Sequence, residues 1–581
     1  MSSNQQTIPS VLERRRALEE QFPVWEKNSL ATHFKKQCHM YHDRPLIVMP
    51  DHVMTYGEMW KRSFLYAKAF LSMGVKRRDH VAILMTNHPD YLALFTAASI
   101  VGAVVVPINT QLREEELTYI IRQSDTNWLL FHQFSGKKNH AEVIKRIAEN
   151  LNASPNSYLK QVVCIPNADA PVPNGFIGWS DFISGADTVS DYEVDQRWQE
   201  VDEPDDCVAI IYTSGSTGLP KGVMLTDEMM LRSGFATCLS RAYEDGRRIF
   251  APLPFYHVYF LQEGLFAVSF VGGTMVTCLG FSPLQAFGLM EKYQVHDFLA
   301  VPSMLVAMLN RSECKTFQLD HLYALLCCAA PSPVPLWKRA VEALQVTEIG
   351  TGCGGTEASS TTMLTEIGDS LDIISTKVGK IKLAGAAGDP EFGSASVMYK
   401  VIDPDTGADL PEGSVGELAV RGNVVTPGYY KNPEETAFAI NHDGFLRSGD
   451  LGQIDKQGYI QLFGRSKDLY KVSGETVAPK EIEDVISLHS AVNQVYIIGV
   501  PDKLTTEAGA AFIELKQGVH CTKREIREWC KERVARFKIP RYVWFVTAND
   551  WPLTGTGKIQ KFKLQTIAKE KLSKHAEDFL M

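Results

Sequence analysis

The chain has 581 residues, too many for one hydrophobic core, and we expect a large and a small domain. Hydrophobic residues make up 45% and charged residues 22%, as in soluble globular proteins, and the net charge of −9 argues against a dedicated nucleic-acid binder. No apolar run reaches the roughly 20 residues of a transmembrane helix, and the N-terminal residues lack the apolar stretch of a secretory signal. We therefore predict a cytoplasmic protein without a transmembrane segment.

Strand and helix patterns alternate over the first 200 residues. Leu12, Leu18 and Phe22 fit an amphipathic helix near the N-terminus. Apolar periodicity then predicts strands at 80–85, 104–109 and 127–132, with helices between them at 89–103 and 113–123. Residues 168–201 are richer in Pro, Gly, Ser and Asp and are expected to form a connection, before a strand at 207–214 opens a second section. This alternation predicts parallel sheets covered by helices.

The pattern changes near residue 397, where short strands separated by Gly, Asp and Asn predict an antiparallel, β-barrel-like element up to Arg465. The strand–helix pattern then restarts. We expect a helix at 480–488, strands at 494–500 and 510–515, and a helix at 522–535. We predict an α/β protein with a large N-terminal domain, residues 1–466, made of two α/β sheet subdomains and the β-barrel-like element. A small α+β domain at 467–581 follows.

The eleven cysteines are scattered and form no CxxC pair, so neither a disulfide framework nor a zinc site is indicated. Adjacent Cys327 and Cys328 follow an apolar run. We expect them to pack in the core without redox chemistry, because free cysteine is often buried.

The strongest chemical signal is YTSGSTGLPKG, Tyr212 to Gly222, between a strand and a helical pattern. Its glycines can present backbone N–H groups to an anion, its hydroxyls add donors, and Lys221 adds a charge suited to polyphosphate. It is not a Walker A loop, because Leu219 and Pro220 separate Gly218 from Lys221. A flexible connector is the alternative, but a connector does not require the preceding strand or the following Pro-Lys-Gly.

Six further motifs follow in chain order: PFYHVYF (254–260), GCGGTE (352–357), SGDLG (448–452), GRSKD (464–468), VSGETVAP (472–479) and PLTGTGKIQK (552–561). Together the motifs resemble those of the acyl-adenylate-forming enzymes, which include acyl-CoA ligases, firefly luciferase and peptide-synthetase adenylation domains. The resemblance extends from about Ala31 to Leu564. It implies a mobile C-terminal domain and a loop that closes over the β- and γ-phosphates of ATP, formed by Thr213, Ser214, Gly215, Ser216, Thr217, Gly218 and Lys221.

The resemblance identifies Gly352, Cys353 and Gly354 as part of the adenylate site, with Thr356 at the α-phosphate and Glu357 as the Mg²⁺ ligand. Mg²⁺ bound to phosphates commonly uses one protein carboxylate and several waters, although a lone Glu after a glycine-rich turn is more often a solvated loop residue or a helix cap. Cys353 departs from the family, which usually has an aromatic residue stacked on adenine. We expect weaker recognition of the base.

Other nucleotide contacts are implied at Ala329, Asp450 and Arg465. Ala329 begins an Ala-Ala-Pro run in place of the family's Gly-Ala-Pro, and a small residue there leaves room for the ligand. Asp450 would accept hydrogen bonds from both ribose hydroxyls, as one carboxylate can, whereas a turn Asp is the alternative for an isolated motif. Arg465 would reach the ribose or a phosphate, and Lys467 would be the hinge.

The resemblance places coenzyme A beside Lys471, Val472, Ser473 and Gly474 once the small domain has turned, and Gly474 lets the pantetheine chain pass. Lys558 occupies the position of the adenylation lysine, whose ammonium offsets charge as pyrophosphate leaves. A lone Lys in a glycine-rich loop is otherwise usually solvated.

The resemblance implies that His257 gates the acid pocket and contacts the carboxylate or the approaching thiol, and the alternative is a histidine packed in an aromatic-rich core. The sequence leaves both open. Tyr256, Tyr259 and Phe260 are expected to line or support the acyl pocket. For Glu263, on the helix that follows, we favour a surface position over contact with a cationic acid.

The predicted function is that of an AMP-forming acid–CoA ligase. A small carboxylic acid attacks MgATP to give acyl-AMP and pyrophosphate, the small domain rotates about Lys467, and the thiol of CoA then displaces AMP. The alternative is an adenylating enzyme with a carrier protein or oxygen as acceptor, and the 23 residues after Lys558 favour free CoA over a fused carrier. A third possibility, a nucleotide sensor with a decayed site, conflicts with the presence of Lys221, Glu357, Asp450 and Lys558. The sequence identifies neither the acid nor the oligomeric state.

Overall fold

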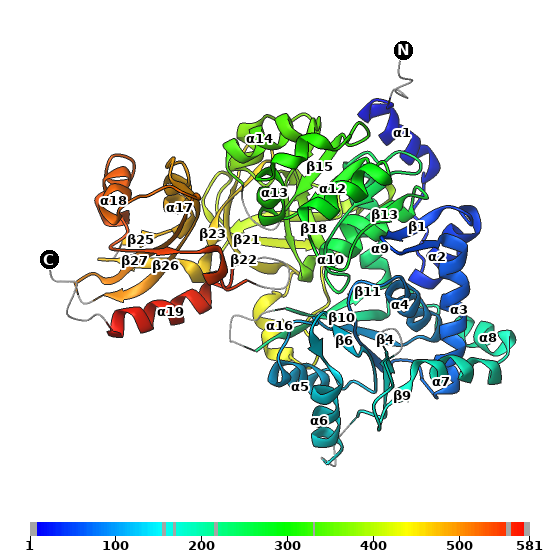
Figure 1. Ribbon diagram of the computed structural model, residues 1–581. Coiled ribbons are helices and arrows are strands. Elements are labelled where there is room, and N and C mark those ends of the chain that lie inside the picture. Colours follow the sequence, from blue (N-terminus) through cyan, green and yellow to red (C-terminus); the bar gives the residue numbers. More distant parts are fainter. Residues whose placement is uncertain are drawn as a thin grey trace.

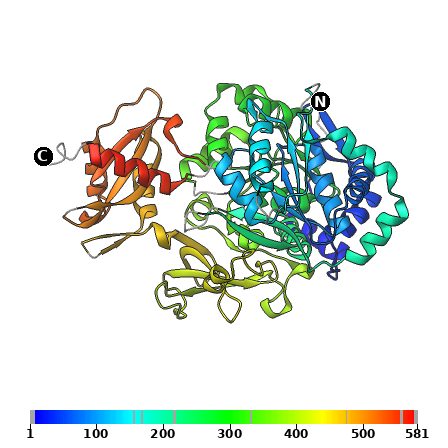
Figure 2. The ribbon, with the colours of Figure 1, turned by 90° about the horizontal axis from the view of Figure 1, so that it is seen from below.

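The computed structural model describes residues 8–153, 158–166, 170–213, 219–328, 332–473, 475–502, 504–553 and 559–574. Figure 1 shows a large body of sheets and helices followed by a smaller body at the C-terminal end, and Figure 2 separates the same two bodies in a second view. The α/β fold class is confirmed. The position of the domain boundary, which we predict between residues 466 and 467, stays a prediction.

The first large sheet has seven strands, all parallel to their neighbours except the pair β10–β11. In spatial order they are β11 (Lys221–Thr226), β10 (Cys207–Thr213), β4 (Val104–Pro107), β3 (His80–Leu84), β5 (Trp128–His132), β8 (Gln161–Ile165) and β9 (Ile177–Gly178). The central strands are buried along their whole length. Their unbroken apolar sequences are typical of parallel strands covered on both faces.

The second large sheet also has seven strands, parallel except for the hairpin β1–β2. Its spatial order is β16 (Glu348–Gly350), β15 (Ala324–Cys327), β14 (Asp297–Ala300), β12 (Arg248–Phe250), β13 (Thr274–Val276), β1 (Pro45–Met49) and β2 (His52–Thr55). One core joins both sheets, because it contains residues of β3 and β14 together with residues of α4 (Pro89–Val101) and α9 (Asp227–Ser240). Every residue of α4 is buried, as expected for a helix that is apolar on all sides.

Two smaller sheets complete the large body. A three-stranded sheet consists of β17 (Gly352–Gly355), β18 (Ser360–Leu364) and β19 (Lys380–Ile381). The antiparallel element expected after residue 397 is a four-stranded sheet of β20 (Val397–Ile402), β21 (Gly416–Gly422), β22 (Leu446–Ile454) and β23 (Ile460–Arg465). Met363 and Ile460 share one hydrophobic cluster, so the two sheets pack together.

In the part of it that the structure describes, the C-terminal body has a five-stranded sheet and three α-helices. Its elements are β24 (Tyr470–Val472), β25 (Glu475–Val477), α17 (Pro479–Ser487), β26 (Val492–Asp502), β27 (Thr506–Leu515), α18 (Lys523–Lys531), β28 (Tyr542–Val546) and α19 (Lys561–Lys574). The two hydrophobic clusters of this sheet contain no residue before Tyr470. It therefore has cores of its own, as a separate α+β domain requires.

The expectation that residues 168–201 form a connection was wrong in one respect, because this stretch contains α7 (Trp179–Ser184) and α8 (Asp191–Val201). Ser190 and Glu193 form a capping box at the start of α8, and Val194 and Trp198 are buried. The acidic and small residues of this stretch are cap and surface positions of helices. At the N-terminus, α1 (Val11–Gln21) forms as expected, with Leu18 buried but Leu12 exposed. Within the described part of the chain, no helix is both long and apolar enough to span a membrane.

Candidate active site

The two ends of the predicted phosphate loop are fixed by strand pairing. Thr213 closes β10, Lys221 opens β11, and the two residues are direct partners across the antiparallel pair. Ser214, Gly215, Ser216, Thr217 and Gly218 lie outside the described residues, as do Ala329, Gly474 and Lys558. The register of β10 and β11 therefore defines where the loop leaves and rejoins the sheet.

Lys221 is connected to Glu357 through a tyrosine. The Lys221 ammonium forms an ion pair with Glu435 and lies 5.2 Å from the centroid of the Tyr429 ring. The Tyr429 hydroxyl donates a hydrogen bond of 3.1 Å to Oε1 of Glu357. The structure thus brings together the predicted phosphate lysine and the predicted metal carboxylate, although 136 positions separate them in the sequence.

Tyr429 and Glu435 lie outside the motifs and were not predicted from the sequence. Glu435 lies in the first turn of α16 (Pro433–Ala439), where Pro433 is the first helical residue and the side chain of Asn432 accepts a hydrogen bond from the Glu435 N–H. The segment Asn-Pro-Glu-Glu is a recognisable helix start. The sequence could have predicted the helix from this signal, but not its proximity to Lys221.

The glycine-rich turn before Glu357 is shaped by close strand packing. A Cβ at Gly354 would lie 1.9 Å from the carbonyl oxygen of Ser360, and a Cβ at Gly352 would lie 2.5 Å from that of Met363. Both glycines are therefore needed for β17 to pair with β18. Thr356 is buried, and the Thr426 N–H donates a 2.7 Å hydrogen bond to the backbone oxygen of Glu357.

Asp450 and Arg465 face each other across β22 and β23. Nε of Arg465 lies 2.7 Å from Oδ1 of Asp450. The carboxylate of Asp450 holds the pKa of Arg465 above its ordinary value against the effect of burial, and Glu357 acts in the same direction. These charges place the predicted ribose residues and the predicted metal ligand in one electrostatic environment.

His257 caps the helix that follows it. Its Nδ1 accepts a 3.1 Å hydrogen bond from the Tyr259 N–H, at the start of the consecutive segments α10 (Val258–Phe260), η2 (Leu261–Phe266, a π-helix) and α11 (Ala267–Ser269). The Tyr259 hydroxyl donates to the carbonyl oxygens of Ala300 and Leu326, and Phe260 stacks on Phe255 with centroids 4.0 Å apart. These two aromatic residues support the segment. The cap agrees with a structural role of His257 and leaves its catalytic role a prediction.

The expected surface position of Glu263 was wrong, because its side chain is completely buried. It forms an ion pair with Lys382, whose Nζ lies 3.0 Å from Oε1 of Glu263. The expectation failed because Lys382 is 119 residues further along the chain. Cys327 and Cys328 are buried as expected, and burial raises the pKa of the Cys328 thiol to about 12.

The predicted CoA segment belongs to the C-terminal sheet. The Val472 side chain lies in the core of that domain, Lys471 is exposed, and Ser473 occupies a left-handed turn with φ of 52°. Val472 can therefore contact a ligand only through its backbone. Lys467 lies in the short helix η7 (Ser466–Asp468), directly before this sheet.

The residues present fit a magnesium ion held mainly by its nucleotide. Within the described ranges, no group of three or more His, Cys, Asp or Glu side chains could hold a metal by itself. Glu357 offers one carboxylate, connected through Tyr429 to the predicted phosphate lysine, and Mg²⁺ commonly uses one carboxylate when substrate phosphates provide further ligands.

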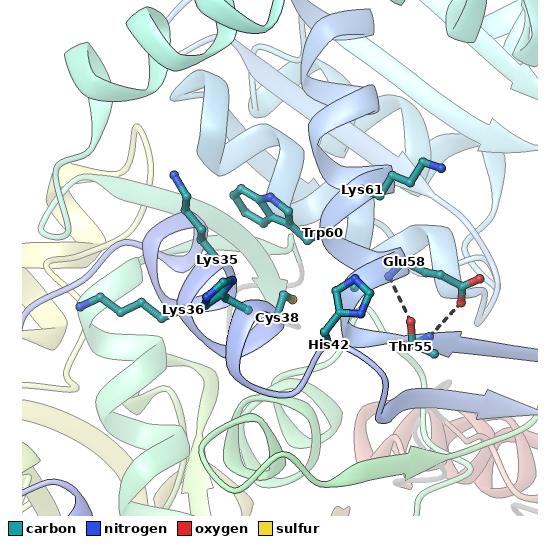
Figure 3. Close-up of a pocket in the computed structure, with 10 residues that line it drawn as sticks. Lys35, Lys36, Cys38, His42, Thr55, Glu58, Trp60 and Lys61 are labelled. Carbon is teal, nitrogen blue, oxygen red and sulfur yellow. Dashed lines mark hydrogen bonds between the residues drawn. The ribbon is translucent and has the colours of Figure 1, made fainter.

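Two cavities among the described residues have different linings. One of about 500 Å³ is lined by residues on either side of Tyr429, including Met224, Lys431 and Thr436. The other, of about 770 Å³, lies between α2 (Leu30–Met40) and α3 (Tyr56–Ser72) and contains none of the predicted site residues. Figure 3 shows Trp60 and Cys38 in it, with lysine side chains around them. The first cavity adjoins the candidate site and the second does not.

Comparison with known proteins agrees with this architecture. Residues 34–430 match the model of the AMP-binding enzymes, and residues 481–558 match that of the AMP-binding enzyme C-terminal domain. YngI from Bacillus subtilis (strain 168) is 33% identical over 537 residues, which are 90% of this chain and 94% of that protein. Acyl-CoA ligase SID4 from Ajellomyces capsulatus is 30% identical, over 94% and 92% of the two chains. The crystal structure of the anthranilate CoA ligase AuaEII with anthranoyl-AMP is 25% identical and superposes with a TM-score of 0.81, over 94% and 99% of the chains. The chain therefore belongs to the AMP-binding enzyme family, within the acyl-adenylate-forming enzymes that its motifs resemble.

Proposed function

We propose that the enzyme is an AMP-forming acid–CoA ligase. It joins a carboxylic acid to ATP, giving acyl-AMP and pyrophosphate, and then transfers the acyl group to coenzyme A with release of AMP. The observation that carries the proposal is the connection from Lys221 through the Tyr429 side chain to Glu357, a cation and a carboxylate of the kinds that MgATP requires. The similarity to SID4 and to AuaEII, both described as CoA ligases, supports it.

In the first half-reaction the chain positions charge around the triphosphate. Lys221 is partly exposed and already paired with Glu435, so its ammonium is held at the loop before ATP binds. A phosphate oxygen can replace the carboxylate as its partner. The hydrogen bond from Tyr429 orients the carboxylate of Glu357, which would hold Mg²⁺, and the ion would supply charge neutralisation to the phosphates. Lys558 would bridge the acid and the α-phosphate.

Asp450 is proposed to bind the ribose. One of its oxygens already accepts from Arg465, so the ribose hydroxyls compete with the guanidinium or share the carboxylate with it. An AMP phosphate can then replace the carboxylate of Asp450 as the partner of Arg465.

The second half-reaction is proposed to use a rotation of the C-terminal domain about Lys467. The hydrophobic clusters of this domain are separate from those of the large body, so no apolar core would have to open during the rotation. The segment Lys471–Gly474 would then approach CoA.

We also propose a cytoplasmic location.

The experiment is an assay of AMP and pyrophosphate release over a panel of carboxylic acids, with and without CoA. We expect pyrophosphate release to depend on the acid, and AMP release to depend on both the acid and CoA. Acid-dependent pyrophosphate exchange without acyl-CoA formation would instead indicate another acceptor, such as a carrier protein or oxygen. Absence of exchange with every acid would favour a nucleotide sensor and contradict the proposal.

A further inference from the structure

The helical segment that begins after His257 is anchored on two sides. The Tyr259 hydroxyl donates to carbonyl oxygens at the ends of β14 and β15, and a Cβ at Gly264 would lie 2.7 Å from Cε of Met275 in β13. On another side, Glu263 contacts α9 and β18. The central part, η2, has π-helical geometry, which is frequent at functional sites because it inserts a residue into a helix.

Glu263 has no capacity left for a ligand. Its Oε1 accepts from the Thr361 N–H at 3.0 Å, the Thr361 hydroxyl at 2.5 Å and Lys382 at 3.0 Å, and its Oε2 accepts from Thr237 and Lys382 at 2.7 and 3.2 Å. The third donor of Lys382 goes to the Thr237 hydroxyl at 2.6 Å. The carboxylate and the ammonium neutralise each other and satisfy each other's hydrogen bonds. This group therefore fixes the helix and offers no charge to a substrate, which also removes the possibility that Glu263 binds a cationic acid.

The residue before Glu263 has polar atoms without hydrogen-bond partners in the described residues. Gln262 is completely buried, yet neither its Nε2 nor its Oε1 has a hydrogen-bond partner among the residues that the structure describes. Buried polar atoms are almost always hydrogen-bonded, because leaving one without a partner is costly. An amide offers two N–H donors and an acceptor oxygen. The amide of Gln262 therefore has hydrogen-bonding capacity that a bound molecule can use.

A second polar atom without a partner lies near the same segment. The Tyr91 hydroxyl on α4 is buried and has no partner in the described part of the chain, and its ring packs edge-on against Phe255 with centroids 5.9 Å apart. Phe255 in turn stacks on Phe260. Tyr91 thus packs against the pair of aromatic residues on either side of His257, and Gln262 lies five residues after His257, in the segment where the sequence predicts the acid pocket.

We propose that Gln262 is a specificity residue for the acid, and that the preferred acids carry an uncharged hydrogen-bonding group, such as a hydroxyl, on their carbon chain. A hydroxyl can donate to the amide oxygen and accept from its N–H. The Glu263–Lys382 pair offers no free counter-charge to a second charged group on the acid, because its two charges neutralise each other. This inference rests on the proposed function and names the substrate class of the same site.

The test compares acids of equal length, hexanoate and its positional hydroxy isomers, by kcat/KM for pyrophosphate release. The natural enzyme should prefer at least one hydroxy isomer by about tenfold or more, because a site with a buried hydrogen-bonding group rejects the analogue that lacks the partner. Gln262→Leu should abolish this preference and improve the use of hexanoate. Gln37→Leu is the matched control, since Gln37 on α2 is also buried and its Oε1 has no partner; it should leave the ratio unchanged.

Three outcomes would overturn the inference. The first is a natural enzyme that prefers hexanoate to every hydroxy isomer. The second is an active Gln262→Leu enzyme with an unchanged ratio, which would mean that the amide binds a structural water. The third is absence of pyrophosphate release with all acids, which would overturn the proposed function as well and so differs from the other two. Thermal unfolding checks the fold of each variant, and Gln262→Met provides a second apolar replacement.

Discussion

Two lysine–glutamate pairs, one in the core and one at the candidate site, show how surroundings decide the role of the same chemistry. The side chains of Lys382 and Glu263 are 3% and 0% exposed, whereas those of Lys221 and Glu435 are 11% and 23% exposed. In the core pair every donor and acceptor is used within the protein. In the site pair the lysine opens β11, directly after the predicted phosphate loop.

The difference follows from desolvation. A fully buried pair must satisfy all its hydrogen bonds internally, because neither ion can be exchanged for water without opening the core. A partly exposed pair costs less to separate, so a phosphate can displace its carboxylate. The core pair therefore holds elements together, and the site pair keeps a cation ready for ATP.

The largest expected effect comes from breaking the core pair. Lys382→Met leaves the Glu263 carboxylate charged and unpaired, which should lower the free energy of unfolding by about 3–5 kcal/mol. The double variant Glu263→Gln/Lys382→Met should recover most of this loss, because no buried charge remains. Urea unfolding of the two variants measures it. Equal stability of Lys382→Met and the natural protein would show that the pair is not an anchor.

Breaking the site pair should affect catalysis and leave stability nearly unchanged. Lys221→Met should slow acid-dependent pyrophosphate release by about 100-fold or more, as loss of a preorganised charge-stabilising group does. Lys377→Met is a matched control, because Lys377 likewise pairs with a carboxylate, that of Asp455, and lies 5.0 Å from the ring of Tyr459. Similar rates for the two variants would contradict the role of Lys221.

A smaller effect is expected from removing the hydroxyl of Tyr429, which connects the site pair to the predicted metal ligand Glu357. Tyr429→Phe removes the hydrogen bond to Glu357, worth about 1 kcal/mol, and should raise the Mg²⁺ concentration for half-maximal pyrophosphate release about fivefold. Tyr430→Phe serves as control, since its hydroxyl donates to Asp125. If both variants give the same magnesium titration as the natural enzyme, Tyr429 does not orient the metal ligand.

The smallest effect is a pH dependence confined to acid solution. Burial raises the pKa of Glu263, but the charge of Lys382 and the hydrogen bonds from Thr361 and Thr237 outweigh it and hold the pKa below the ordinary 4.5. The stabilisation is therefore complete above about pH 4.5 and is lost as the pH falls through the folded-state pKa, at no more than about 1.4 kcal/mol per pH unit. Relative to the double variant, the natural protein should lose stability only below this pH, as urea unfolding at pH 7, 5 and 4 would measure. A difference that already changes between pH 7 and 5 would contradict the lowered pKa.

Features that depend on local sequence patterns could be predicted, whereas contacts between distant residues could not. Strand patterns such as His80–Leu84 and the motif around Lys221 are local, and the fold class and the family followed from them. The partners of Glu263 and Lys221 lie 119 and 214 residues away, so only the tertiary structure reveals them. The capping box of α8 was a local signal that the composition of its surroundings obscured.

The central claim is that the acid is activated as an acyl-adenylate, and an isotope transfer tests it directly. A carboxylic acid labelled with ¹⁸O in its carboxylate is incubated with the enzyme, MgATP and CoA, and the products are analysed by mass spectrometry. Attack of the carboxylate on the α-phosphorus leaves one carboxylate oxygen on AMP when the thiol displaces it. The account predicts ¹⁸O in AMP and none in pyrophosphate. Acyl-CoA formation with unlabelled AMP, or with the label in inorganic phosphate, would contradict it.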